Sequence, residues 1–83
     1  MKLVYFAWVR ERIGKSDEDL SCPEGVGDIN ALVDHLINLA EGYKNAFENR
    51  DKVKVAINQN HVNWDHPVKE GDEVAFFPPV TGG

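Results

Sequence analysis

The segment LVYFAWV, residues 3–9, carries the strongest structural signal in the chain. Most of its residues are β-branched or aromatic, and apolar side chains occupy both alternating faces. This pattern is typical of a strand that is covered on both sides. The sequence therefore predicts a central strand over residues 3–9.

Two features after this segment predict an N-terminal hairpin. Residues 10–16 contain Gly14 and several charges, which favour a turn. Residues 17–22 return as a second strand, which Pro23 ends because proline donates no hydrogen bond to a sheet.

One main helix is predicted in the middle of the chain. Asp28 suits the N-cap, where its carboxylate accepts backbone amides of the first turn. The apolar residues that follow recur at helical spacing: Ile29, Leu32, Val33, Leu36, Ala40 and Tyr43. Gly42 is the predicted C-terminal stop, and residues 43–49 add a short helical segment with Ala46 and Phe47 inward.

The C-terminal half predicts more strands. Residues 53–57 form one, residues 58–61 favour a turn, and residues 62–64 give a weak strand signal. Residues 69–72 form a turn before the last strand, residues 73–77, which Pro78 and Pro79 end.

This order of elements predicts an α+β fold in one domain, residues 1–83. A mixed sheet of four to five strands carries one main helix across one face, and the two most apolar strands, the first and the last, lie side by side in its middle. A β-grasp architecture satisfies this arrangement.

Composition narrows the class of function. The formal net charge is -5 and the basic residues are scattered, so neither nucleic acid nor an anionic membrane is an expected partner. No apolar run is long enough to span a bilayer, and the single cysteine, Cys22, suits a reducing compartment, so we expect a cytoplasmic protein. Cys22 lacks an adjacent basic residue, and the three histidines lack ligand spacing, so neither a nucleophilic thiol nor a metal site is expected.

The end of the chain, residues 79–83, is expected to be a flexible reactive tail. From Phe77 to Gly83 it could reach roughly 20 Å from the sheet, at about 3.3 Å per residue. Gly82 and Gly83 carry no side chains and could enter a narrow tunnel. The terminal carboxylate would then be the reactive group, once transfer to the α-phosphate of ATP gives it a leaving group as an acyl-adenylate. Sulfide could displace AMP and leave a thiocarboxylate.

Three stretches resemble a known family: VYFAWVRERIG (residues 4–14), VAINQ (55–59) and DHPVKEGDEVAFFPPVTGG (65–83). They are similar to the small, sulfur-carrying subunits of molybdopterin synthase, the MoaD family. The resemblance implies a ubiquitin-like β-grasp fold and a role in molybdenum cofactor biosynthesis. It also implies that Gly83 is adenylated by a MoeB-like activating enzyme, which uses ATP, and then becomes a thiocarboxylate. This chain would bind no cofactor itself.

The resemblance further implies a partner. The large subunit, MoaE, would use the thiocarboxylate to put sulfur into cyclic pyranopterin monophosphate, within a heterotetramer. The chain would thus be part of an enzyme, a sulfurtransferase, without being catalytic alone. The residues expected to contact partners are Phe6, His61, Phe77, Pro78, Pro79, Val80 and Thr81.

Several alternatives stay open at this stage. Phe6 and Phe77 could belong to the core, and Trp8 could belong to the core or the interface. His61 departs from the apolar residue that the family commonly has there. The same Gly-Gly end would serve a ubiquitin-like protein modifier or a thiamin-type sulfur carrier, and the chain could also be a binding module whose tail does nothing.

Overall fold

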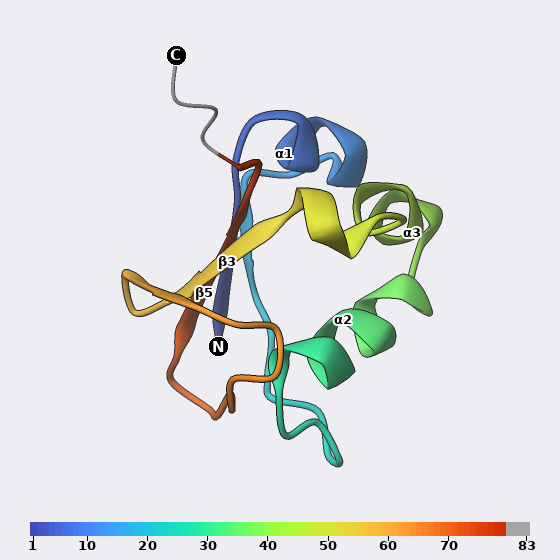
Figure 1. Cartoon of the computed structure of the whole chain (residues 1–83). Helices are drawn as coiled ribbons and strands as arrows, with labels where there is room; N and C mark the ends of the chain where they lie inside the picture. The colour runs from blue at the N-terminus through green and yellow to red at the C-terminus, as the bar shows by residue number, and fades with distance from the viewer. Residues whose placement is uncertain (80–83) are drawn as a thin grey trace.

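The computed structural model describes residues 1–79, in which one mixed sheet packs against a layer of helices (Figure 1). The elements in chain order are β1 (Lys2–Tyr5), α1 (Ala7–Ile13), β2 (Asp17–Asp19), α2 (Ile29–Ile37), α3 (Glu41–Ala46), the 3-10 helix η1 (Arg50–Lys52), β3 (Lys54–Ile57), β4 (Asn60–Val62) and β5 (Glu73–Phe77).

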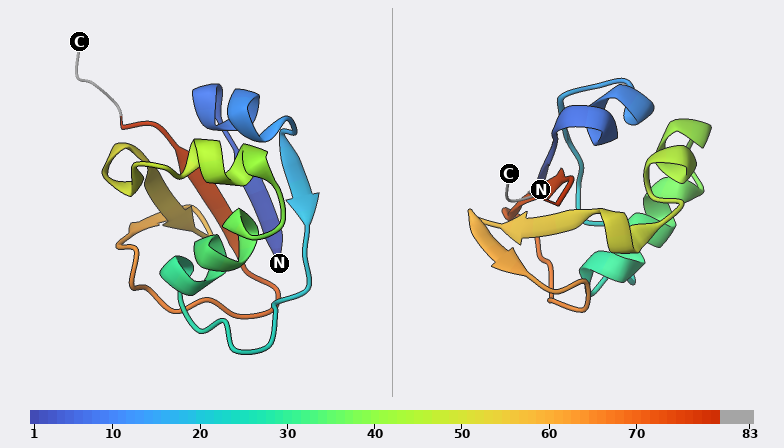
Figure 2. Two further views of the ribbon diagram at one scale, coloured as in Figure 1. Left: turned by 90° about the vertical axis from the view of Figure 1, so that its right-hand side faces the viewer. Right: turned by 45° about the horizontal axis from the view of Figure 1, so that its top comes forward.

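The strand order across the sheet is β2-β1-β5-β3-β4. The first and last strands lie side by side in the middle and run parallel, with Tyr5 opposite Phe76, as the sequence predicts. The other neighbouring strands pair antiparallel. Figure 2 shows α2 and α3 lying across the sheet and α1 lying at one end of it, where β1 and β5 finish. The predicted mixed sheet and its helical layer are confirmed, with five strands.

The predicted strand over residues 3–9 is wrong in its second half. The strand ends at Tyr5, and the Phe6 amide still donates to the Phe76 carbonyl at 3.1 Å. Ala7 then adopts a φ of 53°, which turns the chain off the sheet and into α1. Gly14, with a φ of 92°, ends α1 by donating its amide to the Arg10 carbonyl at 2.8 Å. The predicted turn over residues 10–16 is therefore mostly helix.

The main helix begins as predicted. The Asp28 carboxylate accepts the Ala31 amide at 2.8 Å, and Ile29, Leu32, Val33 and Leu36 of α2 are buried. However, Gly42 is not a stop, because it lies inside α3. A Cβ at Gly42 would lie 2.9 Å from the Arg12 carbonyl oxygen and 3.1 Å from that of Ile13. Glycine is required because the backbone of α1 crosses α3 at this point.

The predicted strand over residues 62–64 lies two residues too late. Asn58 and Gln59, with φ of 50° and 73°, form a tight turn between β3 and β4, so pairing resumes at Asn60. Trp64 lies outside β4 and packs against the core, where its indole nitrogen donates to the Val53 carbonyl at 3.2 Å. The last strand has the predicted bounds.

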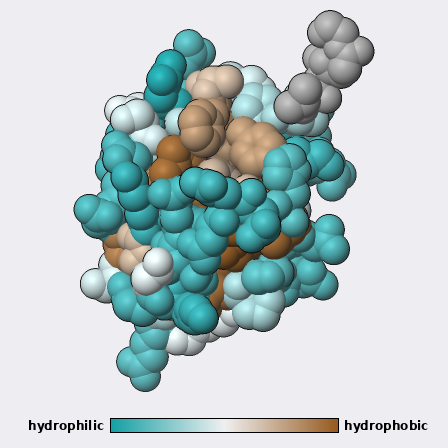
Figure 3. All heavy atoms as spheres, turned by 90° about the vertical axis from the view of Figure 1, so that its left-hand side faces the viewer, coloured by the Kyte–Doolittle hydropathy of each residue, from teal (hydrophilic) through white to brown (hydrophobic). Residues whose placement is uncertain are grey.

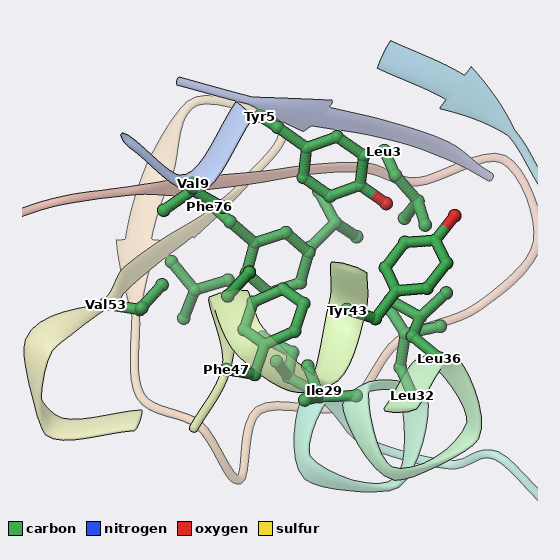
Figure 4. Packing of buried hydrophobic residues seen from close by; sticks show 14 of the residues in the cluster. Leu3, Tyr5, Val9, Ile29, Leu32, Leu36, Tyr43, Phe47, Val53 and Phe76 are labelled. Atoms are coloured by element: carbon green, nitrogen blue, oxygen red, sulfur yellow. The ribbon is translucent and has the colours of Figure 1, made fainter. Parts of the chain in front are cut away.

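Aromatic rings form the centre of the core (Figure 4). Phe76 of β5 is fully buried, with its ring centroid 5.0 Å from that of Phe47 and 6.0 Å from that of Tyr5. The hydroxyls of Tyr5 and Tyr43 both donate to one carboxylate oxygen of Glu18, and Lys15 pairs with the other oxygen at 3.3 Å. This cluster joins β1, β2 and α3 to Lys15, which follows the end of α1.

Candidate functional site

Alternation along β5 separates a core face from an open face of the sheet. Val74 and Phe76 are fully buried beneath the helices, whereas Glu73, Ala75 and Phe77 point to the other side and are partly exposed. The same alternation in β1 places Leu3 and Tyr5 inward. The open face has no helix over it among the described residues, and its apolar side chains are at least partly exposed, except that of Ala56, which is buried.

Phe6 and Phe77 lie next to each other on this open face. They directly follow the register pair Tyr5 and Phe76, whose side chains point inward. Phe6 has extended backbone angles and its side chain is 48% exposed, while Phe77 is half-buried. The alternative that both belong to the core is therefore wrong for Phe6 and does not fit Phe77.

His61 lies beside Phe77 on the same face. It pairs with Ala56 across the β3–β4 hairpin, and its ring centroid lies 5.2 Å from that of Phe77. The ring is exposed. His61 therefore extends the aromatic surface toward the edge strand β4.

Small apolar residues, which were not predicted as site residues, form the floor between these side chains. Val4 pairs with Ala75 of β5, and Ala75 pairs with Ala56 of β3. Figure 3 shows this side of the molecule, with apolar side chains gathered in a patch that polar side chains surround. The residues that form this docking face, as we name it, are Val4, Phe6, Ala56, His61, Ala75 and Phe77. Once β5 is identified as a central strand, its alternation would reveal Ala75.

Pro78 and Pro79 carry the chain away from the end of β5, between two grooves. One groove, about 410 Å³, lies on the β3–β4 side and includes His61, Phe77 and Pro79. The other, about 930 Å³, lies between α1 and the segment after α3, and includes Trp8, Pro78 and Pro79. Trp8 is half-buried and lines this second groove instead of the docking face. The predicted tail residues Val80, Thr81, Gly82 and Gly83 lie outside the described residues.

Other candidate chemistry is sparse in residues 1–79. No group of three or more histidine, cysteine, aspartate or glutamate side chains there could hold a metal ion. The Cys22 thiol lies 3.7 Å from the Val26 carbonyl oxygen in a loop. Within the same residues, no helix has the length and apolar character to cross a membrane.

Comparison with known sequences gives matches along the whole chain. The pattern of the ThiS family matches residues 3–83. The molybdopterin synthase sulfur carrier subunit of Escherichia coli is 40% identical over 83 residues, which cover 100% of this chain and 99% of that protein. The protein of the same name from Haemophilus influenzae is 37% identical, with the same coverage.

Comparison with solved structures agrees on the fold. SAMP1 from Haloferax volcanii aligns with a TM-score of 0.72 and 27% identity over 100% of this chain and 98% of that one. A putative molybdopterin converting factor subunit 1 from Pyrococcus furiosus gives a TM-score of 0.69 and 30% identity, over 95% of each chain. A complex of subunits 1 and 2 of the molybdopterin-converting factor from Helicobacter pylori gives 0.64 at 23% identity, which speaks to the fold alone. The fold is the predicted ubiquitin-like β-grasp.

Proposed function

The chain belongs to the ThiS family, and we propose that it is the sulfur carrier subunit of a molybdopterin synthase. The observation that carries the proposal is the full-length similarity to sulfur carrier subunits, at 40% identity for the Escherichia coli protein. The geometry supports it. The central strand β5 leads directly through Pro78 and Pro79 toward the Gly-Gly end, and an exposed aromatic face lies at its base.

The proposed chemistry takes place at the carboxylate of Gly83. One carboxylate oxygen bonds to the α-phosphorus of ATP, and the bond from that phosphorus to pyrophosphate breaks. The resulting acyl-adenylate is then attacked at its carbonyl carbon by a sulfide equivalent, which forms a carbon–sulfur bond and releases AMP. A MoeB-like enzyme supplies this activation site, and the chain contributes the carboxylate.

The proposed acceptor is cyclic pyranopterin monophosphate, held by the large synthase subunit, MoaE. The substrate is anionic and this chain has a formal net charge of -5, so the cations that hold the phosphate come from the large subunit. A thiocarboxylate is ionised near neutral pH and needs no neighbouring general base. Two sulfurs are needed for each dithiolene, so two carriers are consumed in a heterotetramer.

The docking face supports a protein partner of this kind. Phe6, Phe77 and His61 form an exposed aromatic surface around a small apolar floor, and aromatic residues are enriched in protein interfaces. The face lies at the root of the tail. A partner that covers it would therefore also receive the C-terminus.

Reconstitution tests the proposal. The purified chain is incubated with the activating enzyme, ATP and a sulfide source, and its intact mass is measured. We expect a mass gain equal to the difference between sulfur and oxygen, located in the C-terminal peptide and dependent on ATP. An unchanged mass with an activating enzyme that thiolates a known carrier would contradict the proposal.

A second candidate, a protein modifier, is favoured by the similarity to SAMP1, which another of the solved structures names as small archaeal modifier protein 1. The same acyl-adenylate would then be attacked by a lysine amine of another protein. Peptide mass spectrometry of cell extracts separates the two candidates. Branched peptides that join Gly83 to lysine, without any thiocarboxylate, would support the modifier.

A further inference from the structure

The larger groove at the root of the tail, which we name the basic groove, is lined by α1, by the chain from the end of α3 to η1, and by the residues after β5. Trp8 and Arg12 come from α1, Lys52 comes from η1, and Pro78 and Pro79 follow β5. Figure 2 shows these segments meeting at the same end of the sheet. Pro79 also lines the groove beside His61 and Phe77, so the basic groove and the docking face are neighbours where the chain leaves β5.

Arg12 is oriented, and no carboxylate of residues 1–79 pairs with it. Its guanidinium carbon lies 4.5 Å from the centre of the Trp8 ring, and one of its nitrogens donates to the Asn45 carbonyl at 3.3 Å. Within residues 1–79, neither Arg12 nor Lys52 takes part in an ion pair. Glu48 is the only acidic residue among the described lining residues, against these two cations. A chain of net charge -5 thus has a locally basic groove.

We propose that the basic groove is a second docking site, which binds an acidic segment of the large subunit while the docking face binds that subunit's apolar surface. This inference rests on the proposed function. A carboxylate can bind the guanidinium of Arg12 with two parallel hydrogen bonds, and the Trp8 ring holds the guanidinium plane in place for it. Lys52, which also lines the groove, adds a second positive charge.

The chain's own terminal carboxylate is a poorer occupant of the groove. An exposed ion pair favours the bound state by no more than about fivefold. Fixing the backbone of a chain segment in one conformation disfavours the bound state by about fivefold or more for each residue. A folded partner segment is already ordered and excludes water from the groove, which strengthens the same charge pairs.

Charge reversal tests the proposal in the full-length chain. We would measure the affinity of Arg12→Glu, Lys52→Glu and the unchanged chain for the purified large subunit by calorimetry, at low and at physiological salt. Each variant should bind about tenfold or more weakly and should depend less on salt. Arg12→Lys keeps the charge but cannot form the two parallel hydrogen bonds, so its affinity should lie between that of Arg12→Glu and that of the unchanged chain. The matched control is Lys69→Glu, which makes the same charge change in an exposed residue just before β5, at the other end of that strand.

Three outcomes would overturn the proposal, and they are distinguishable. If the unchanged chain binds the large subunit and Arg12→Glu and Lys52→Glu bind within twofold of it, the groove is not a docking site and the proposed function stands. If the unchanged chain neither binds the large subunit nor is thiolated, the proposed function fails too. If Arg12→Glu leaves the affinity unchanged but speeds carboxypeptidase digestion of the free chain, the groove binds the chain's own tail instead.

Discussion

At the scale of single residues, Phe77 lies where the buried core borders the docking face. Its neighbour Phe76 is fully buried, whereas Phe77 lies on the open side with its ring near His61. Substitution of Phe77 therefore changes the surface without removing a buried ring.

We predict that Phe77→Asp weakens binding to the large subunit by at least about tenfold, because it places a charge at the centre of an apolar interface. The free energy of unfolding should change little. Leu39→Asp is the control, since Leu39 is 56% exposed and follows α2, away from the docking face. Equal affinities of Phe77→Asp and Leu39→Asp, measured by calorimetry, would show that the docking face is not used.

We expect the pH dependence of folding stability to come mainly from Glu18. Partial burial would raise its pKa, but the hydrogen bonds from Tyr43 and Tyr5 and the nearby Lys15 outweigh burial, so the pKa of Glu18 lies below its ordinary value. Burial and the hydrogen bond to Glu18 raise the pKa of Tyr5 far above its ordinary value. Both shifts favour the folded state near neutral pH.

The direction of the pH dependence follows from these shifts. The contribution of Glu18 is present above its unfolded pKa, about 4.3, and is lost as the pH falls through the lower folded value. The contribution of Tyr5 is complete below about pH 10 and is lost as the pH rises further. We predict that Glu18→Gln lowers the free energy of unfolding by about 1–2 kcal/mol at pH 7 and by less at pH 3. Urea unfolding of both proteins at pH 7 and pH 3 checks this prediction. An equal loss of unfolding free energy at the two pH values would contradict it.

At the scale of the element, helix α1 packs against α3 through a close backbone contact. Its last turn crosses α3 at Gly42, where an added Cβ would lie 2.9 Å from the Arg12 carbonyl oxygen. The same helix carries the Trp8 and Arg12 side chains that line the basic groove. Displacement of α1 should therefore affect both stability and the groove.

We predict that Gly42→Ala destabilises the fold by about 1–2 kcal/mol. Overpacking against backbone costs about 1–3 kcal/mol, which exceeds the gain of up to about 1 kcal/mol from alanine's helix propensity. Gly27→Ala is the matched control, since its Cβ meets nothing within 4 Å and its φ is ordinary. That variant should be neutral or stabilised by up to about 1 kcal/mol. If denaturant unfolding gives Gly42→Ala a higher free energy of unfolding than Gly27→Ala, the close-contact explanation is refuted.

The sequence predicts the sheet better than it predicts α1. The alternation of β5 and the N-cap at Asp28 are local signals, and both agree with the structure. In contrast, LVYFAWV suits a strand throughout, and the turn at Ala7 follows from how α1 packs on α3, which is a tertiary effect. A local signal for α1 exists in Val9 and Ile13, four residues apart on one helix face, with Gly14 as the αL cap.

The candidate site was predictable where a residue lies on a strand of known register. Phe6 and Phe77 were expected in an exposed aromatic patch, and both lie on the open face of the sheet, while their contact with a partner stays a prediction. Ala56 and Ala75 were missed because small residues give no sequence signal for an interface, and their pairing depends on the long-range register of β3 and β5. Arg12 and Lys52 were missed because the groove forms only when α1 and η1 meet.

At the scale of the whole molecule, recognition and chemistry are proposed to belong to different parts of the chain. The docking face and the basic groove are neighbours where the chain leaves β5, while the proposed reactive atoms belong to Gly83. Recognition and chemistry should therefore be separable by substitution.

We predict that deletion of Gly83, or addition of one residue after it, reduces sulfur transfer to background while the affinity for the large subunit changes less than about tenfold. The chemistry depends on the position of the terminal carbonyl, whereas most of the binding surface lies in the folded body. Product formation measures sulfur transfer, and calorimetry on the same preparations measures the affinity for the large subunit. Transfer that survives either change would place the reactive group elsewhere.

The most direct test of sulfur carriage is a single-turnover reaction. Thiocarboxylated chain is mixed with the purified large subunit and cyclic pyranopterin monophosphate, and the intact mass of the chain and the amount of dithiolene product are followed together. The proposed function predicts that two chains return to the carboxylate form for each product formed. Product formation while the chain keeps its sulfur, or loss of its sulfur without product, would contradict it.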